Sequence, residues 1–330
     1  MVALLRAPLQ EVRTPVLDSR RWARFEPRAD DIVIATFPKS GTTWMQRIVD
    51  LLVFLSPDVR PVGKISPWLD CTFFGSLDDD LSRLQAQTHR RYIKSHLPFD
   101  ALPHWDSVKY IHVARDGRDA RLSWMNHQQG FTPEMRAKIA SRAVALAKER
   151  NEPPGGAPPS SPEDPREFLL QWFDELNVAL ENPNAGAASL NLDYFGFEAT
   201  YWRERRQPNL LLVHYNDLKE NLEEEMWRIA GFLQIAPPRD LMPALVKAAS
   251  FETMKKEGNA LNPTLKTSFD KGAERFINKG LSGRWRQYLD ASDVSRYEAI
   301  ASRAATPRLA QWLADGRKGA GNPQTAPDWS

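Results

Sequence analysis

The chain has 330 residues, of which 42% are hydrophobic and 26% charged, and its 44 lysines and arginines against 42 acidic residues give a net charge of +2. This is the composition of a folded globular protein, and so small a net charge argues against nucleic acid as a partner. Cys71 is the only cysteine, which excludes internal disulfides and cysteine-rich metal sites. No apolar run approaches the ~20 residues of a membrane-spanning helix, and the N-terminus lacks a signal-like stretch. We therefore expect a cytoplasmic protein without membrane insertion.

Short apolar runs predict buried β-strands at residues 32–36, 92–94, 108–114 and 209–214. Their continuous apolarity is typical of a parallel sheet that is covered on both faces. Stretches with helical spacing separate them, at residues 44–55, 119–125, 167–180, 195–205 and 222–233. Strands that alternate with helices predict an α/β fold with three layers around a central, mainly parallel sheet. We expect one domain over residues 1–330, with its core at about residues 30–290.

The most informative segment is residues 31–44 (DIVIATFPKSGTTW), where a polar turn separates the first strand from the first helix. Backbone N–H groups and the helix dipole favour an anion at such a helix start, and Gly41 permits close approach. The side chains that could bind the anion together with these backbone groups are those of Lys39, Ser40, Thr42 and Thr43. The turn is not a Walker A sequence, because its lysine precedes a lone glycine. It predicts a phosphate site, and the alternative interpretation is an ordinary capped helix.

Two further segments also suit an anion. In residues 113–123 (VARDGRDARLS), Arg115 follows a predicted strand and Ser123 lies in the next helix. A forked guanidinium and a hydroxyl suit a phosphate monoester, although Arg115 could instead pair with a neighbouring aspartate. Residues 275–285 (RFINKGLSGRW) combine Lys279 with two glycines, which favours either a backbone clamp on an anion or an exposed loop.

These three segments together resemble the cytosolic-type sulfotransferase family, whose fold is P-loop NTPase-like. In that family FPKSGTTW corresponds to the 5′-phosphosulfate loop, VARDGRDARLS to the 3′-phosphate segment, and INKGLSGRW to the C-terminal RKGxxGDW loop. YIKSHLP, at residues 92–98, resembles the KTHLP segment that carries the family's catalytic histidine. LLLVHYNDLKE and SFETMKK resemble segments that contact adenine.

The resemblance implies an enzyme that transfers the sulfuryl group of 3′-phosphoadenosine 5′-phosphosulfate (PAPS) to a hydroxyl or amine of a small acceptor. It implies His96 as the general base, Lys39 as the cation at the leaving phosphate and Lys94 as an assisting cation, roles that sulfuryl transfer requires. The residues that it assigns to the nucleotide are Lys39, Ser40, Gly41, Thr42 and Thr43 at the 5′ end, Trp44, Tyr215 and Phe251 at the adenine, and Arg115, Ser123, Lys279 and Gly280 at the 3′-phosphate.

No metal is expected, because the transferred group carries a single negative charge. The other histidines show no metal-ligand spacing and receive no role; they are His89, His104, His112, His127 and His214. His112 and His214 lie in predicted strands and are expected to be core residues. A nucleotide-dependent kinase is one alternative, but it would need a Walker A loop and a magnesium-binding acid. A non-catalytic nucleotide-binding protein is the other, but it would not need both Lys39 and His96.

The C-terminal loop departs from the family pattern. Asn278 stands where the family usually has arginine, and Arg284 stands where it has aspartate. Arg275 or Arg284 could supply the missing charge. The stretch after Trp285 lacks the pattern with which many relatives form a small dimer interface, so the oligomeric state stays open.

The acceptor pocket is expected to come from residues 67–75, the segment around residues 131–150 and residues 194–201. Its candidate aromatic residues are Trp68, Phe73, Phe74 and Phe131, which suit a phenol, a steroid or another apolar alcohol. The alternative is that these residues belong to the core. Residues 128–164 are longer than the matching stretch in many relatives and predict a helix followed by a proline- and glycine-rich arm. We expect a lid over the acceptor site there, with an insertion of no role as the alternative. The polar tail at residues 316–330 is expected to be poorly ordered.

Overall fold

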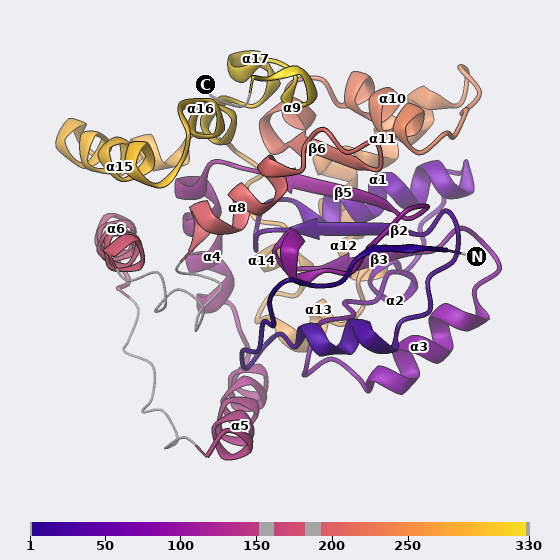
Figure 1. Cartoon of the computed structure of the whole chain (residues 1–330), viewed down its shortest axis with the longest axis horizontal. Coiled ribbons are helices and arrows are strands. Elements are labelled where there is room, and N and C mark those ends of the chain that lie inside the picture. Colours follow the sequence, from indigo (N-terminus) through magenta and orange to yellow (C-terminus); the bar gives the residue numbers. More distant parts are fainter. Residues whose placement is uncertain (1, 152–161, 182–192, 328–330) are drawn as a thin grey trace.

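The computed structural model describes residues 2–151, 162–181 and 193–327, and its centre is a parallel sheet (Figure 1). Within those residues the sheet has four strands in the order β3-β2-β5-β6, and each neighbouring pair is parallel. The strands are β2 (Ile32–Thr36), β3 (Tyr92–Ser95), β5 (Lys109–Ala114) and β6 (Leu210–His214). A separate antiparallel pair joins β1 (Leu4–Arg6) to β4 (His104–Trp105). The predicted strands and their parallel arrangement are confirmed.

Helices form much of the remaining described chain. The longer ones are α1 (Thr42–Phe54), α3 (Leu77–Ala86), α4 (Gly117–Gln129), α5 (Pro133–Glu149), α6 (Pro165–Glu181), α8 (Tyr194–Arg203), α10 (Leu222–Phe232), α11 (Met242–Ala249), α12 (Phe251–Leu261), α15 (Ala291–Ala304) and α16 (Pro307–Asp315). The short ones are α2 (Val62–Ile65), α9 (Tyr215–Glu220), α13 (Leu265–Ser268), α14 (Ala273–Phe276), α17 (Arg317–Ala320), η1 (Ser19–Arg24), η2 (Phe99–Ala101), η3 (Arg284–Gln287) and η4 (Pro323–Thr325). Of the helices in the described residues, none is both long and apolar enough to cross a membrane.

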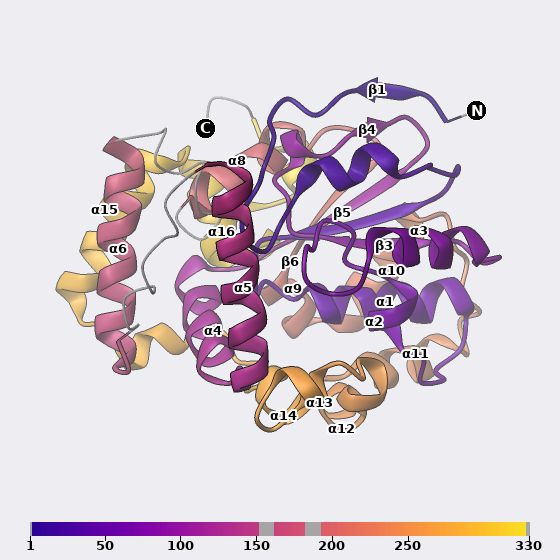
Figure 2. The same ribbon diagram turned by 90° about the horizontal axis from the view of Figure 1, so that it is seen from below.

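The sheet separates two apolar cores, because successive side chains of a strand point to opposite faces. Ile32 and Ile34 of β2 pack on one face with residues of α1, α10 and α11. Val33 and Ala35 pack on the other face in a cluster that includes residues of α6, α8, α15 and α16. Figure 2 shows α1, α10 and α11 on one side of the strands, with α8 and α16 on the other. This confirms the predicted α/β fold with three layers.

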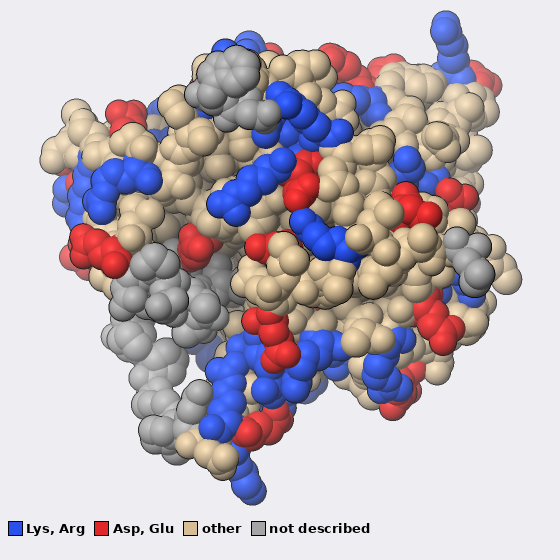
Figure 3. All heavy atoms as spheres, in the orientation of Figure 1, with Lys and Arg blue, Asp and Glu red and all other residues tan. Residues whose placement is uncertain are grey.

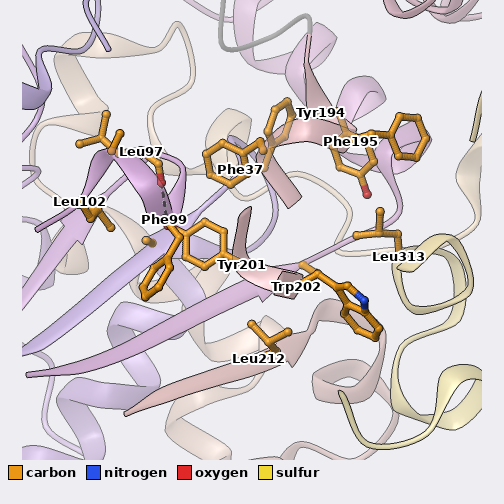
Figure 4. Packing of buried hydrophobic residues seen from close by; sticks show 14 of the residues in the cluster. Phe37, Leu97, Phe99, Leu102, Tyr194, Phe195, Tyr201, Trp202, Leu212 and Leu313 are labelled. Atoms are coloured by element: carbon orange, nitrogen blue, oxygen red, sulfur yellow. Dashed lines mark hydrogen bonds between the residues drawn. The ribbon is translucent and has the colours of Figure 1, made fainter. Parts of the chain in front are cut away.

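Buried aromatic residues of α8 fix that helix against the sheet and the segment after β3 (Figure 4). Tyr201 donates its hydroxyl hydrogen to the carbonyl oxygen of Leu97 at 2.7 Å. The ring of His112, on β5, stacks on Tyr201 with centroids 3.8 Å apart. His112 also bonds to Glu198 at 2.7 Å and to the Ala35 carbonyl at 3.0 Å. His112 is therefore a core residue, as expected.

Charged side chains of both signs mix on the face shown in Figure 3, where η1 and α5 lie at the surface. Arg20 of η1 pairs with Asp18 at 2.6 Å, and Glu149 of α5 pairs with Arg13 at 2.8 Å. These two ion pairs place opposite charges side by side on this part of the surface.

The C-terminal tail differs from the prediction of poor order. Residues after Gly316 form α17 and η4, and the buried guanidinium of Arg205 donates to the carbonyl oxygens of Pro323 and Ala326, each at 3.0 Å. The contact depends on backbone carbonyls, which every residue carries, so composition gives no sign of it. Residues 328–330 of this tail lie outside the described residues, as do residues 152–161 of the predicted arm.

Candidate active site

The carboxyl ends of the parallel strands gather the predicted site residues at one edge of the sheet. The loop with Lys39 follows β2, His96 follows β3, Arg115 follows β5 and Tyr215 follows β6. In open α/β sheets ligands bind outside the carboxyl ends of the strands. Motifs that are far apart in the sequence thus become neighbours in space.

The loop between β2 and α1 contains two left-handed backbone conformations, at Lys39 with φ 70° and at Gly41 with φ 108°. A Cβ atom on Gly41 would lie 3.0 Å from Cδ2 of Tyr215, so both the conformation and the close approach require glycine. Gly41 caps α1 without a side-chain hydrogen bond, and the helix therefore offers its first N–H groups to an anion. The hydroxyl oxygens of Thr36 and Thr42 lie 2.6 Å apart, which fixes the start of the helix.

The ammonium of Lys39 lies in a cationic and poorly hydrated position. Its Nζ is 3.3 Å from Nδ1 of His127 and 4.2 Å from the ring centroid of Phe276. Burial, followed by the charges of Arg115 and Lys94, lowers the pKa of Lys39 to about 7. A bound anion would reverse this, because it stabilises the charged form of the lysine. Lys39 thus has the properties of a phosphate-binding cation.

His96 is 7% exposed, and its tautomer follows from one contact. Its Nδ1 lies 2.7 Å from the carbonyl oxygen of Thr36, and because a carbonyl only accepts, Nδ1 must donate. Nε2 then keeps a free lone pair. Burial, followed by the charge of Lys94, lowers the pKa of His96 well below its usual range, so the ring is neutral at neutral pH. A neutral imidazole with a free nitrogen can act as a general base.

Lys94 lies on β3, two residues before His96, and its Nζ is 4.1 Å from the ring centroid of Trp68. The same indole contacts His96 edge-on, with centroids 4.8 Å apart. Burial lowers the pKa of Lys94 to about 8. Trp68 therefore holds the predicted assisting cation and the predicted base beside each other.

Arg115 connects the ends of two strands to the C-terminal loop. Its Nη1 donates to the Lys39 carbonyl at 3.0 Å, and its Nη2 donates to the Leu281 carbonyl at 3.1 Å. Its guanidinium carbon lies 4.2 Å from the ring centroid of Tyr215. The alternative of pairing with a neighbouring aspartate is not seen: Asp116 binds Arg118 instead, and Asp119 accepts from backbone N–H groups of residues 283 and 284.

Aromatic residues predicted to contact adenine line the next part of the site. Trp44 donates from its indole nitrogen to the Ala249 carbonyl at 2.8 Å and meets Tyr215 edge-on at 5.3 Å. Phe251 begins α12 and packs against Gly280, where a Cβ atom would lie 2.4 Å from the phenyl ring. Gly280 also has φ 60°, so no larger residue fits there without a shift of the chain.

One cavity of about 1440 Å³ joins these groups. The predicted residues that line it are Lys39, Gly41, Thr42, Thr43, Trp44, Lys94, His96, Arg115, Ser123, Tyr215, Phe251, Lys279 and Gly280. Ser40 is not among them, and its buried hydroxyl has no hydrogen-bond partner in the described part of the chain. Asn278 and Arg284 line the cavity, whereas Arg275 pairs with Asp270 at 2.9 Å. Of the two candidates for the missing charge, only Arg284 thus lines it.

The far end of the cavity is apolar. Trp68, Phe73, Phe74 and Phe131 line it as predicted, together with residues that the sequence did not single out, which are His127, Phe168, Phe269 and Phe276. The expectation for residues 194–201 is wrong. Tyr194 is buried in the core and donates its hydroxyl hydrogen to the Arg115 carbonyl at 2.6 Å, because α8 faces the sheet rather than the cavity.

The fold and the site together define an α/β protein whose cavity, at the carboxyl ends of parallel strands, combines cationic side chains with aromatic rings. The family model of the Sulfotransferase domain matches residues 29–313. The glycolipid sulfotransferase of Mycobacterium tuberculosis is 36% identical over 315 residues, which cover 93% of this chain and 94% of that protein. Dog sulfotransferase 1B1 is 27% identical and covers 84% of each chain. This chain belongs to the sulfotransferase family and is a PAPS-dependent sulfotransferase.

Solved structures share the fold. Retinol dehydratase in complex with retinol and PAP superposes with a TM-score of 0.63 at 22% identity, over 86% of this chain and 83% of that one. Mouse sulfotransferase SULT7A1 complexed with PAP gives a TM-score of 0.62 at 18% identity, over 94% of this chain and 98% of that one. At these identities the likeness concerns the arrangement of the elements.

Proposed function

We propose that this sulfotransferase moves the sulfuryl group of PAPS to a hydroxyl of an acceptor with a large apolar body, with His96 as the base. The observation that carries the proposal is the shared cavity: Lys39, His96 and a set of apolar rings line one continuous space. A transfer reaction needs the donor, the base and the acceptor in such a space, since in-line positioning supplies much of the rate.

His96 has the geometry of the base. With Nδ1 donating to the Thr36 carbonyl, the ring can take the acceptor's hydroxyl proton only at Nε2. As that oxygen attacks sulfur and the bond from sulfur to the bridging oxygen breaks, negative charge develops on the departing phosphate. Lys39 is the cation that we place there, with Lys94 beside it.

We assign the nucleotide to the polar end of the cavity. The uncapped start of α1 and Lys39 suit the 5′ end, whereas Arg115, Ser123 and Lys279 suit the 3′-phosphate. Ser40 is kept in this set as a prediction, although its buried hydroxyl does not line the cavity. Gly41 and Gly280 mark the two places where a side chain would fill the space.

The apolar end points to the class of acceptor. Phenyl and indole rings around His96 favour an apolar body that carries a hydroxyl, rather than a free sugar. The mycobacterial relatives are named as glycolipid sulfotransferases, and the solved retinol dehydratases hold retinol or androsterone. We therefore propose a lipid-like alcohol or a glycolipid as the acceptor.

The test is transfer from ³⁵S-labelled PAPS with the purified enzyme. The panel comprises 2-naphthol, a sterol, a synthetic glycolipid, glucose and an alkyl amine, with the His96→Ala variant as the control for enzyme-dependent label. We expect sulfation of the apolar hydroxyl compounds and none of glucose. Preference for glucose would contradict the proposed acceptor class, and transfer to the amine alone would contradict a hydroxyl acceptor.

We also propose that α5 is the lid of the acceptor end. Its residues Arg136, Ile139, Ala140 and Ala143 line the cavity, and a lid that excludes water would suppress hydrolysis of the activated sulfuryl group. Limited trypsin digestion with PAP and 2-naphthol should protect Arg136 and Lys138 relative to the free enzyme. Unchanged cleavage at these sites would leave α5 as an insertion without this role.

A further inference from the structure

Within the described residues, the contacts of the Lys39 side-chain end are with His127 and Phe276, and neither of them is an acid. Nδ1 of His127 lies 3.3 Å from Nζ, and the ring of Phe276 lies beneath it at 4.2 Å. The charged groups that face Lys39 are Arg115 and Lys94, both positive. In the described part of the chain no ion pair is formed by Lys39. A long, flexible side chain among like charges needs some fixed partner if its ammonium is to keep one position.

His127 is a rigid partner because aromatic rings surround it. Its imidazole stacks on Trp124 with centroids 5.2 Å apart. Phe131 meets it edge-on at 4.7 Å and Phe269 lies tilted against it at 4.8 Å, centroid to centroid. Burial, followed by the charges of Lys39 and Lys94 and the neighbouring His96, lowers the pKa of His127 well below its usual range. The neutral ring can therefore accept at Nδ1, and an ammonium can only donate.

We propose that His127 is the positioning residue of Lys39: its Nδ1 accepts a hydrogen bond from the ammonium and holds that charge at the boundary between the polar and apolar ends of the cavity. The inference rests on the proposed function for its consequence in catalysis. The contact between His127 and Lys39 does not depend on the proposed function.

A neutral hydrogen-bond acceptor beside the Lys39 ammonium suits an anion-binding site better than a carboxylate does. A carboxylate would neutralise the ammonium and repel an anionic nucleotide, whereas an imidazole fixes the direction of the side chain and leaves its charge available. Asparagine and aspartate at position 127 separate these two properties, because their Oδ1 atom lies near the place of Nδ1 and they differ in charge.

Kinetics of three variants test the catalytic consequence, with PAPS and 2-naphthol as substrates. His127→Phe keeps an aromatic ring and removes the hydrogen-bond acceptor of Lys39. We expect kcat to fall roughly 3- to 10-fold, which corresponds to the free energy of one hydrogen bond, with little change in PAP affinity. His127→Asn should recover most of that loss. His127→Asp should weaken PAP binding as well.

A second measurement does not depend on turnover. Lys39 of the free enzyme is labelled with acetic anhydride across a pH range, and the modified peptide is quantified by mass spectrometry. Loss of the hydrogen-bond acceptor at position 127 destabilises the ammonium and lowers the pKa of Lys39. At pH 6.5, Lys39 should therefore be labelled faster in His127→Phe than in wild type, and more slowly in His127→Asp. Labelling of Lys94, which lines the same cavity, controls for access of the reagent.

The two measurements separate the possible failures. Equal kcat and equal labelling of Lys39 in wild type, His127→Phe and His127→Asp would overturn the inference. A packing role alone would leave His127→Asn without recovery, which also overturns it. A wild-type enzyme that transfers sulfuryl groups to none of the acceptors, but shows the expected labelling, would contradict the proposed function and support the role of His127.

Discussion

The polar and apolar ends of the cavity are built by different rules. At the polar end, backbone conformation decides the geometry: Lys39 and Gly41 are left-handed, and Arg115 bonds to two carbonyl oxygens of distant segments. At the apolar end, rings from several segments meet, and the contacts depend on size rather than on a particular atom. An anion therefore imposes residue types at fixed spacing, whereas an apolar body tolerates many combinations of similar volume.

His96 lies where the two ends meet. Its Nδ1 is held by the carbonyl of Thr36, at the end of the central strand β2, and its ring edge contacts Trp68 of the apolar wall. The comparison therefore predicts that changes at this junction affect turnover, changes at the polar end affect nucleotide affinity, and changes at the apolar end affect the acceptor's KM.

The largest effect is expected at the junction. His96→Ala removes the base, and general-base catalysis contributes ~10²-fold or more, so kcat should fall by at least about that factor. PAP affinity should remain near that of wild type, because the residue acts in the transition state. Initial rates with labelled PAPS and calorimetry with PAP measure the two quantities. Turnover within a few-fold of wild type would show that another group takes the proton.

The second largest effect, a loss of PAP affinity, is expected at the polar end. Arg115→Ala should weaken PAP binding by ~10- to 100-fold, since a charge-assisted hydrogen bond contributes about 1.5–3 kcal/mol. Adenosine 5′-phosphate, which lacks the 3′-phosphate, should lose much less affinity. Arg115→Lys keeps the charge without the fork and should give an intermediate loss. If both nucleotides lost affinity equally, Arg115 would act through its bonds to Lys39 and Leu281 instead.

A smaller effect is expected from protonation of Lys39. Its pKa of about 7 means that at pH 8 the free enzyme holds Lys39 mostly neutral, and a bound phosphate raises that pKa again. PAP binding at pH 8 should then take up between about 0.5 and 1 proton, and affinity should fall as the pH rises above 7.

Calorimetry in buffers of different ionisation enthalpy measures this uptake. Lys39→Met should remove most of it. Lys94→Met measures the share of the second lysine, whose pKa is also lowered, to about 8. If proton uptake were the same in wild type and Lys39→Met, a group other than Lys39 would bind the proton.

The difference between the two ends also explains what the sequence could predict. FPKSGTTW and Arg115 were recognisable because local backbone geometry and charge select their residue types. The four strands were recognisable because a sheet buried on both faces needs continuous apolar runs. The ordered tail after Gly316 is not recognisable from the sequence, because its carbonyl groups make the contacts with Arg205.

His127 was missed although a weak signal exists. It follows Ser123 by four positions on α4, so the two residues share a face of the helix, and the face that carries Ser123 lines the cavity. Phe269 and Phe276 carry no such signal, because their place beside His127 depends on how α13 and α14 pack against α4 and α5. Tyr194 shows the opposite error, an aromatic residue that suits a pocket but belongs to the core.

The smallest effect is expected at the apolar end. Phe74 is half-buried and lies at 4.5 Å from Phe73 and 6.4 Å from Trp68, ring centroid to centroid, so Phe74→Ala removes apolar contact area without exposing a polar group. The KM for 2-naphthol should rise by roughly 3- to 10-fold, the loss expected from part of one phenyl ring, whereas PAP affinity should not change. Val144→Ala is the matched control, because Val144 is an exposed apolar residue of α5 that does not line the cavity. An equal rise in the KM of PAPS and of 2-naphthol would contradict the division of the cavity into two ends, because Phe74 would then be coupled to both substrates.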